Sequence, residues 1–89
     1  MRAVITVVGK DMVGILAKVS GECANHNANV IEVTQSVLQD MFAMVMLVDI
    51  SKLSVELPVF SKTLCEMGEK SALSIHVMHE DIFNSMHRI

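Results

Sequence analysis

Residues 3–16 read AVITVVGKDMVGIL, and this stretch decides how the chain folds. The uninterrupted apolar and β-branched run over residues 3–8 predicts a strand that is buried on both faces. The segment from Gly9 to Gly14 predicts a turn, in which Asp11 can cap a helix by accepting a backbone N–H of the first turn. Apolar residues then recur at helical spacing, at Ile15, Leu16, Val19 and Cys23. The chain therefore opens with a strand, a turn and a helix.

A second strand and a third follow, and together they predict a hairpin. The helix is expected to end within Asn25–Asn29, and residues 30–38 alternate partly, which is typical of an edge strand. Gln39 and Asp40 form the predicted turn. Residues 41–50 are almost continuously apolar, which again predicts a strand buried on both faces. One face of the second strand is expected to carry Ile31, Val33, Gln35 and Val37.

The second helix is marked by apolar residues at intervals of three and four, which define one helix face. Ser54 is the candidate N-cap. Pro58 is expected in the first turn, where its missing N–H costs little. Gly68 is the expected stop of the helix. The buried face is predicted to consist of Leu57, Phe60, Leu64 and Met67.

Residues 73–78 alternate between apolar and polar side chains, which predicts a half-exposed fourth strand. In the tail, Ile82, Phe83 and Met86 lie at helical spacing, and Asp81 is placed to cap a short helix. The tail therefore predicts a third helix.

The order of these elements predicts an α+β fold, a ferredoxin-like βαββαβ sandwich. Its four-stranded antiparallel sheet has the order 4-1-3-2, with two helices on one face and a short C-terminal helix. Strands one and three are the most apolar and would be central. We expect one domain over residues 1–78 and a helical tail over residues 79–89. The open sheet face is still apolar, so the tail or a second copy must cover it.

The composition limits the partners of the chain. Its 89 residues are 52% hydrophobic with a net charge of −3, which suits one small domain that gains from dimerisation. Seven scattered Lys and Arg, without Trp or Tyr, argue against a nucleic-acid partner. No apolar run is long enough for a membrane span, and no leader pattern opens the chain. Cys23 and Cys65 show no metal or redox spacing, so we expect a cytoplasmic protein.

Catalytic, metal and cofactor sites are not predicted. No nucleophile motif accompanies the Ser, His and acidic residues, so we expect no enzyme and no cofactor. The first loop lacks the Cys-x-x-Cys of a copper carrier and the Arg of an acylphosphatase. Phe42 is the single aromatic residue of the two central strands, too few for an RNA-binding module. His76 and His79 would point to opposite faces of one strand, which argues against a metal shared with His87.

The stretch Val7–Leu16, together with Ala28-Asn29-Val30-Ile31, resembles the ACT domain. That family has a strand, a loop of the type x-x-[DN]-x-[PV]-G-[IL]-[IL], and a helix that ends before N-[IV]. The resemblance covers roughly residues 3–78. Residues 80–89 are similar to the end of a family of small stand-alone bacterial ACT proteins of unassigned function. The loop is also similar to the ACT parts of the glycine cleavage repressor and of formyltetrahydrofolate deformylase.

The resemblance implies a regulatory module that binds an amino acid or another small ligand, usually between two domains. The ligand would lie between the first loop of one subunit and the start of strand two of its neighbour, in a homodimer that signals to a protein effector. Asp11 and Asn29 match family positions that contact amino-acid ligands. The implied ligand-binding set is Asp11, Met12, Val13, Gly14, Ile15, Asn29, Val30 and Ile31.

These residue types suit such a ligand. Backbone N–H groups from Met12 to Ile15 would open a helix and receive a carboxylate. Gly14 leaves room for a close approach, and Asn29 offers both a donor and an acceptor. Asp11 would pair with an ammonium group. Two alternatives stay open: Asp11 is only a cap and Asn29 only ends a helix, or the whole chain is a structural or protein-interaction module.

Overall fold

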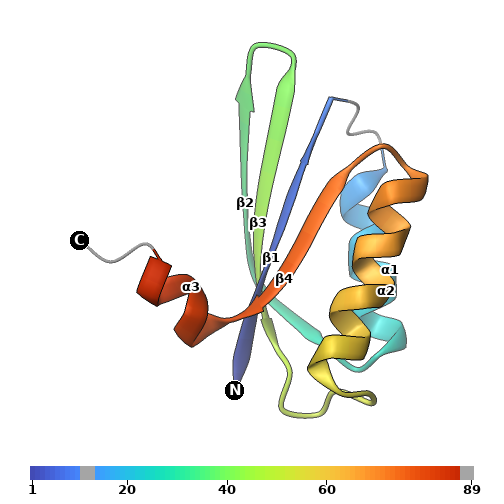
Figure 1. Cartoon of the computed structure of the whole chain (residues 1–89), viewed down its shortest axis with the longest axis vertical. Helices are drawn as coiled ribbons and strands as arrows, with labels where there is room; N and C mark the ends of the chain where they lie inside the picture. Colours follow the sequence, from blue (N-terminus) through green and yellow to red (C-terminus); the bar gives the residue numbers. More distant parts are fainter. Residues whose placement is uncertain (11–13, 87–89) are drawn as a thin grey trace.

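The computed structural model describes residues 1–10 and 14–86, and it contains one four-stranded sheet and three helices in that part of the chain (Figure 1). The sheet order is β2-β3-β1-β4 with every neighbouring pair antiparallel, which confirms the predicted 4-1-3-2 order. The elements are β1 (Arg2–Gly9), α1 (Ile15–Asn25), β2 (Asn29–Leu38), β3 (Met41–Asp49), α2 (Leu57–Lys70), β4 (Ser74–His79) and α3 (Glu80–Met86).

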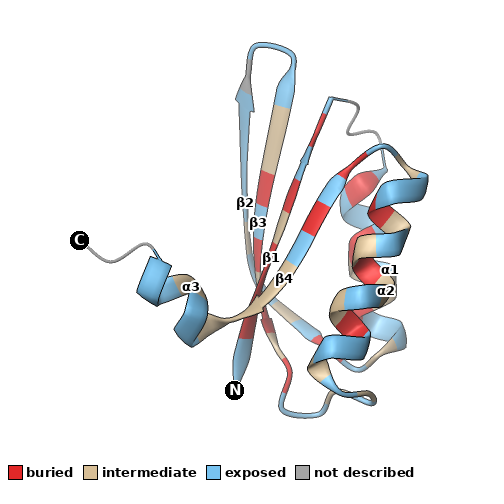
Figure 2. Cartoon of the chain, in the orientation of Figure 1, coloured by how far each residue is buried: buried red, intermediate tan, exposed pale blue. Residues whose placement is uncertain are grey.

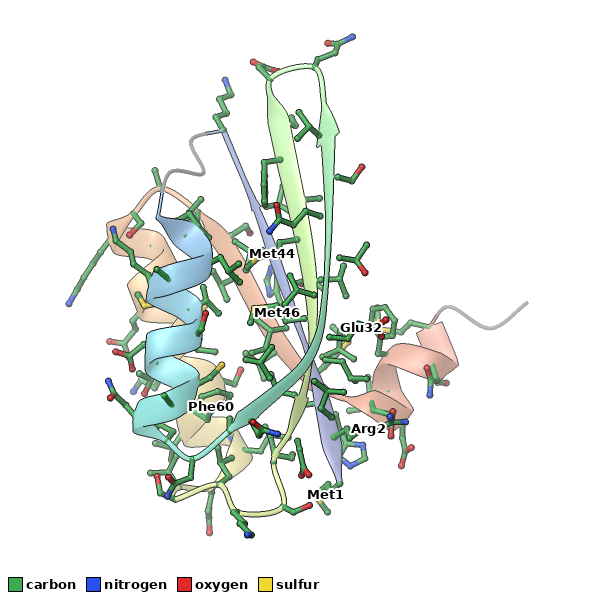
Figure 3. The ribbon with its side chains drawn as sticks, turned by 180° about the vertical axis from the view of Figure 1, so that it is seen from behind. Met1, Arg2, Glu32, Met44, Met46 and Phe60 are labelled. Atoms are coloured by element: carbon green, nitrogen blue, oxygen red, sulfur yellow. The ribbon has the colours of Figure 1, made fainter. Side chains whose placement is uncertain are left out.

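Helices α1 and α2 cover one face of the sheet, and α3 lies on the opposite side (Figure 1). The core fills the space between the sheet and the helix pair. Figure 3 shows Met44 and Met46 of β3 and Phe60 of α2 in this space, whereas Glu32 lies on the side of α3. The buried segments of the helices accordingly face the sheet (Figure 2).

The core confirms the helix periodicity read from the sequence. On α2, Phe60 and Leu64 are fully buried, and Leu57 and Met67 pack against the same cluster. On α1, Ile15, Val19 and Cys23 are buried, but Leu16 is exposed, so its predicted place in the core is wrong. The narrow apolar stripe of α1 reaches the sheet with one residue per turn, and Leu16 lies beside that stripe.

The prediction that strands one and three are buried on both faces is wrong for parts of the sheet face that points away from α1 and α2. Val8 of β1 is 36% exposed and Val45 of β3 is 37% exposed, because both point away from α1 and α2. The tail covers only one end of this open face. There Val4 is buried, and Arg2 forms a 2.6 Å ion pair with Glu80 of α3.

Strand β2 contains an irregularity that reverses part of its predicted pattern. The register with β3 shifts between Val30 and Glu32, so Ile31 is an extra residue and is largely exposed. Val30 and Val33 then pack against the core. The prediction that Ile31 shares a face with Val33 is therefore wrong, because the bulge moves the alternation by one residue.

Helix ends are where local signals were least informative. Gly14, with φ 76°, occupies the N-cap position of α1, in place of the predicted Asp11. The N-cap of α2 is Glu56, not Ser54, and Pro58 lies in the first turn as predicted. Asp81 lies inside the first turn of α3 and is not its cap. Among the described residues, the N-cap positions of α1 and α2 make no side-chain capping hydrogen bond, so chain geometry rather than capping sets where these two helices begin.

Gly68 does not stop α2, which continues to Lys70. The glycine is buried where the helix crosses β4, and a Cβ there would lie 2.8 Å from Cγ1 of Ile75. Glycine is therefore required at this position by close packing rather than by helix termination.

Candidate functional site

The two halves of the predicted ligand site lie at opposite ends of the molecule. Gly14 and Ile15 precede and begin α1, whereas Asn29, Val30 and Ile31 begin β2 after that helix has ended. The 11 residues of α1 separate the halves by about 16 Å along the helix axis (Figure 1). Asp11, Met12 and Val13 lie outside the described residues. A single chain does not bring the two described halves together.

Each described residue of the predicted set presents a different group to a ligand. Gly14 is exposed, and no atom lies within 4 Å of where a Cβ would stand. Ile15 is buried in the core, so its backbone alone is available. Asn29 and Ile31 are exposed, whereas Val30 is half-buried. The set therefore offers a backbone at the start of α1 and an amide at the start of β2.

A hollow lies beside Asn29, at the end of the sheet away from Gly14. It has a volume of about 230 Å³ and is lined by Asn27, Asn29, Asp49, Ser51 and Lys52. We call the space lined by these five residues the polar hollow. A more open depression adjoins it, shares Asn27, Asn29 and Lys52, and reaches Ala24 and Ala28. The hollow thus joins the turn after α1 to the loop after β3.

Backbone hydrogen bonds tie the walls of the polar hollow together. The N–H of Ser54 donates to the carbonyl of His26 at 2.9 Å, which joins the loop after β3 to the turn after α1. Asn29 and Asp49 are direct partners in the β2–β3 register. Asn27 has φ 60°, a left-handed conformation that asparagine adopts more readily than most residues. The five side chains are therefore held on one connected frame.

Asp49 remains ionised at neutral pH. The hydroxyl and the backbone N–H of Ser51 stabilise the carboxylate, the N–H at 2.8 Å, and hold the pKa of Asp49 below its ordinary value. Two positive charges make smaller contributions in the same direction: first the N-terminal ammonium of Met1, which donates a hydrogen bond to the Ser51 hydroxyl at 3.2 Å, and then Lys52. The hollow consequently contains a fixed negative charge and a cation.

Sequence reasoning missed Asn27, Asp49 and Lys52 as site residues. Asp49 ends an apolar strand and Lys52 lies in a short polar connection, and neither position matches a motif. From the sequence, the run Asn25-His26-Asn27-Ala28-Asn29 predicts only a helix end. Its density of asparagine was the one signal that pointed here, since amides next to a helix end can serve a ligand as well as a turn.

Among residues 1–10 and 14–86, no three His, Cys, Asp or Glu side chains converge as metal ligands would. In the pairing of β4 with β1, His76 lies opposite Thr6 and His79 lies opposite Ala3. The two histidines therefore point to opposite faces of the sheet, as their odd spacing predicted. His87 lies outside the described residues. In the same part of the chain, no helix is long and apolar enough to cross a membrane.

Cys23 is a buried thiol on α1, and it supplies a pH-dependent prediction. Burial, with the nearby charge of Glu22, raises its pKa to about 11. The folded chain then keeps a proton that the unfolded chain loses near pH 9, so this stability is full below pH 9 and is lost between pH 9 and 11. We expect a loss of up to about 2.7 kcal/mol. Urea unfolding at pH 8 and 10.5 measures it, and Cys23→Ala should remove the additional pH slope whereas Cys65→Ala should keep it.

The comparisons with known proteins agree with the fold. A family model described as "ACT domain" matches residues 2–78. The chain belongs to the ACT domain family. ACT domains are regulatory ligand-binding modules, and this membership confirms the resemblance seen in the first loop and at the start of β2. The matched residues contain all four strands and both helices of the sandwich, apart from the last residue of β4.

This ACT domain is similar along its whole length to small proteins from distant organisms. It is 47% identical to a UPF0237 protein of Clostridium perfringens, over 100% of both chains. It is 46% identical to a UPF0237 protein of Methanopyrus kandleri, over 99% of this chain and 98% of the relative. The relatives come from archaea as well as bacteria, so the expected bacterial family is wider than predicted.

Solved structures show the same ACT fold. An ACT domain protein from Streptococcus pneumoniae matches with a TM-score of 0.82 and 34% identity, over 93% of both chains. A formyltetrahydrofolate deformylase from Pseudomonas syringae matches with a TM-score of 0.77 and 25% identity, over 88% of this chain and 27% of that one. A putative glycine cleavage system transcriptional repressor matches at 24% identity with a TM-score of 0.67, over 85% and 43%, which shows the shared fold.

Proposed function

We propose that this ACT domain is a regulatory module that acts as a homodimer and binds a small molecule, an amino acid. The ligand lies between the 11–15 loop of one copy and the start of β2, Asn29–Ile31, of the other. It changes how the dimer contacts a protein effector in the cytoplasm, and the module itself catalyses no reaction. The observation that carries the proposal is that the two halves of the site cannot meet within one chain.

Strand register supports a dimer built through β2. Gly9 pairs with Phe42, and Phe42 pairs with Val37, so the end of β1 lies level with the end of β2. If two β2 edges pair antiparallel about an axis between Val33 and Thr34, Asn29 of a second copy lies opposite Leu38. Asn29 of that copy is then level with Gly9, about 14 Å away across three strand spacings. That gap suits two side chains and a ligand of roughly 6–10 heavy atoms.

The surface beside β2 favours such pairing. The outer edge of β2 has no strand partner within the described chain, and Val37 is 67% exposed there. On α1, the residues Ala17, Gly21 and Ala24 are exposed and lie on one helix face. Alanine and glycine on that face leave room for the α1 helix of a second copy, at a spacing that alanine at position 21 would also allow. A domain of 89 residues also gains stability from the added burial.

An amino acid fits the chemistry of both halves. Backbone N–H groups at the start of α1 suit a carboxylate, with help from the helix dipole. Gly14 leaves that approach open, and the Asn29 amide can donate to a carboxylate or accept from an ammonium. The predicted role of Asp11 is to bind the ammonium group.

Thermal unfolding with each common amino acid at about 10 mM tests the proposal. A ligand at 100 times its Kd stabilises the folded dimer by about 2.7 kcal/mol, which raises Tm by several degrees. Asp11→Ala and Asn29→Ala should abolish that rise, and Asn84→Ala on α3 should keep it. Sedimentation should show a dimer. If no amino acid raises Tm, or if the protein sediments as a monomer, the proposal is wrong.

One observation favours a second candidate, a structural or protein-interaction module without a small ligand. Ile82 and Met86 of α3 are 55% and 65% exposed, next to the open face of the sheet. A chain that ends after Met78 separates the two candidates. The interaction module requires that this truncation alters oligomeric state, whereas the ligand-binding homodimer keeps its dimer and its ligand-induced rise in Tm.

A further inference from the structure

The polar hollow holds two opposite charges that form no direct ion pair with each other. Asp49 and Lys52 line the same 230 Å³ space. The ion pairs among the described residues join Arg2 to Glu80, His26 to Glu22 and His79 to Asp81, and none joins Asp49 to Lys52. Each charged group therefore keeps the capacity to bind a group of opposite charge.

Two amides of the polar hollow are also available. The side chains of Asn27 and Asn29 make no hydrogen bond within residues 1–10 and 14–86. Each amide can donate two hydrogen bonds and accept two. The hydrogen-bonded backbone fixes the Cα positions of Asn27 and Asn29, so the two amides are partly preorganised for a ligand.

The size and the charges of the hollow limit the class of ligand. A volume of 230 Å³ is below the usual range for drug-sized ligands, so the occupant is small. A monovalent anion or cation would leave one of the two charged side chains unpaired, whereas a small zwitterion pairs with both. Hydrogen bonds to ionised groups are about twice as strong as neutral ones, so charge at both ends of the ligand would dominate recognition.

We infer that the polar hollow binds the charged ends of the ligand, with Asp49 binding its ammonium group and Lys52 its acidic group. This inference rests on the proposed function, because the hollow contains Asn29. Asp49 joins Asp11 at the ammonium group, which has three N–H donors, and Lys52 joins the α1 N–H groups at the acidic group. Asp49 and Lys52 then determine selectivity: the site prefers zwitterions over ligands in which either charge has been removed. The start of β2 therefore borders a charged hollow, in addition to the Asn29 amide that the sequence indicated.

The test uses the full chain and nitrogen-edited NMR titration with the amino acid that binds most tightly. Its N-acetyl and its amide derivatives serve as probes that lack one charge. Asp49→Asn keeps an oxygen that can accept the N–H of Ser51, and Lys52→Gln keeps most of the side-chain length. Each variant should weaken binding of the zwitterion at least about 10-fold. Asp49→Asn should lose much of its preference for the zwitterion over the N-acetyl derivative, and Lys52→Gln should lose much of its preference for the zwitterion over the amide.

Matched controls make the same charge changes away from the hollow. Asp81→Asn, exposed on α3, and Lys62→Gln, exposed on α2, should leave the affinity unchanged. If Asp49→Asn and Lys52→Gln bind the amino acid as tightly as the control variants do, the inference is overturned, whereas the proposed ligand site of the homodimer is unaffected. If Asp49→Asn and Lys52→Gln weaken binding but Asp11→Ala does not, the hollow binds the ligand and the proposed site shared between two copies is wrong. If wild-type protein binds no amino acid, both fail.

Discussion

Replacement of Phe60 by alanine is expected to lower the free energy of unfolding by about 3–5 kcal/mol. Phe60 is the largest fully buried side chain and lies on α2 between the sheet and the helix pair (Figure 3). Its ring centroid lies 5.5 Å from that of His26, at an interplanar angle of 59°, so it also supports the turn that leads to Asn27. Removal of the ring would leave a cavity at the centre of the core.

The size of this effect matters because small domains are stabilised by only about 5–15 kcal/mol. Urea unfolding at fixed protein concentration, followed by far-UV circular dichroism, measures the loss. Val59→Ala is the matched control, since Val59 is the preceding residue on the same helix and is exposed. The control should change stability by less than about 0.5 kcal/mol. Equal losses in the two variants would mean that the core does not centre on Phe60.

Alanine at Gly68 and at Gly21 is expected to change stability in opposite directions. At Gly68, a Cβ would lie 2.9 Å from the carbonyl oxygen of Leu73 and 2.8 Å from Cγ1 of Ile75, so α2 and β4 must separate. Overpacking of this kind costs about 1–3 kcal/mol. At Gly21, inside α1, no atom lies within 4 Å of the new Cβ. Alanine there should add about 0.5–1 kcal/mol, because glycine is a poor helix former.

The pair of glycine variants is informative because both changes add one methyl group within a helix. Urea unfolding of the two proteins in parallel gives the sign of each change. Stabilisation by Gly68→Ala would contradict the close packing of α2 on β4. Destabilisation by Gly21→Ala would mean that the outer face of α1 is closely covered, for example by a second copy.

The topology of the sheet was predictable because each element carries a strong periodic signal. Residues 3–8 and 41–50 are the most apolar runs, and they became the two central strands. The α2 face from Leu57 to Met67 repeats at helical spacing and packs as predicted. Such patterns report which side of an element is buried, and burial is the main driving force of folding.

Features that depend on a neighbouring element were predicted wrongly. Gly68 looked like a helix stop, because glycine commonly ends helices, but its role is to let β4 approach α2. Ile31 looked like part of an alternating face, but a bulge against β3 makes it the extra residue. Val45 looked buried on hydropathy alone, and α1 and α2 leave its side of the sheet open. None of these outcomes has a local signal.

The candidate site also has one part that a local motif predicts and another part that depends on neighbouring elements. The first loop and Asn29 were recognisable as a motif, and their role in ligand binding stays a prediction. Asp49 and Lys52 had no motif, because they join Asn29 only through the pairing of β2 with β3 and the hydrogen bond from Ser54 to His26.

By itself, the sequence determined the order of elements, the central strands and membership of the ACT domain family, because these follow from local periodicity and a contiguous loop. Tertiary structure alone decided that Asn29 shares a hollow with Asp49 and Lys52, at the end of the sheet away from Gly14. The physical reason is that strand pairing sets distances between residues far apart in sequence, and side-chain periodicity carries no record of those distances.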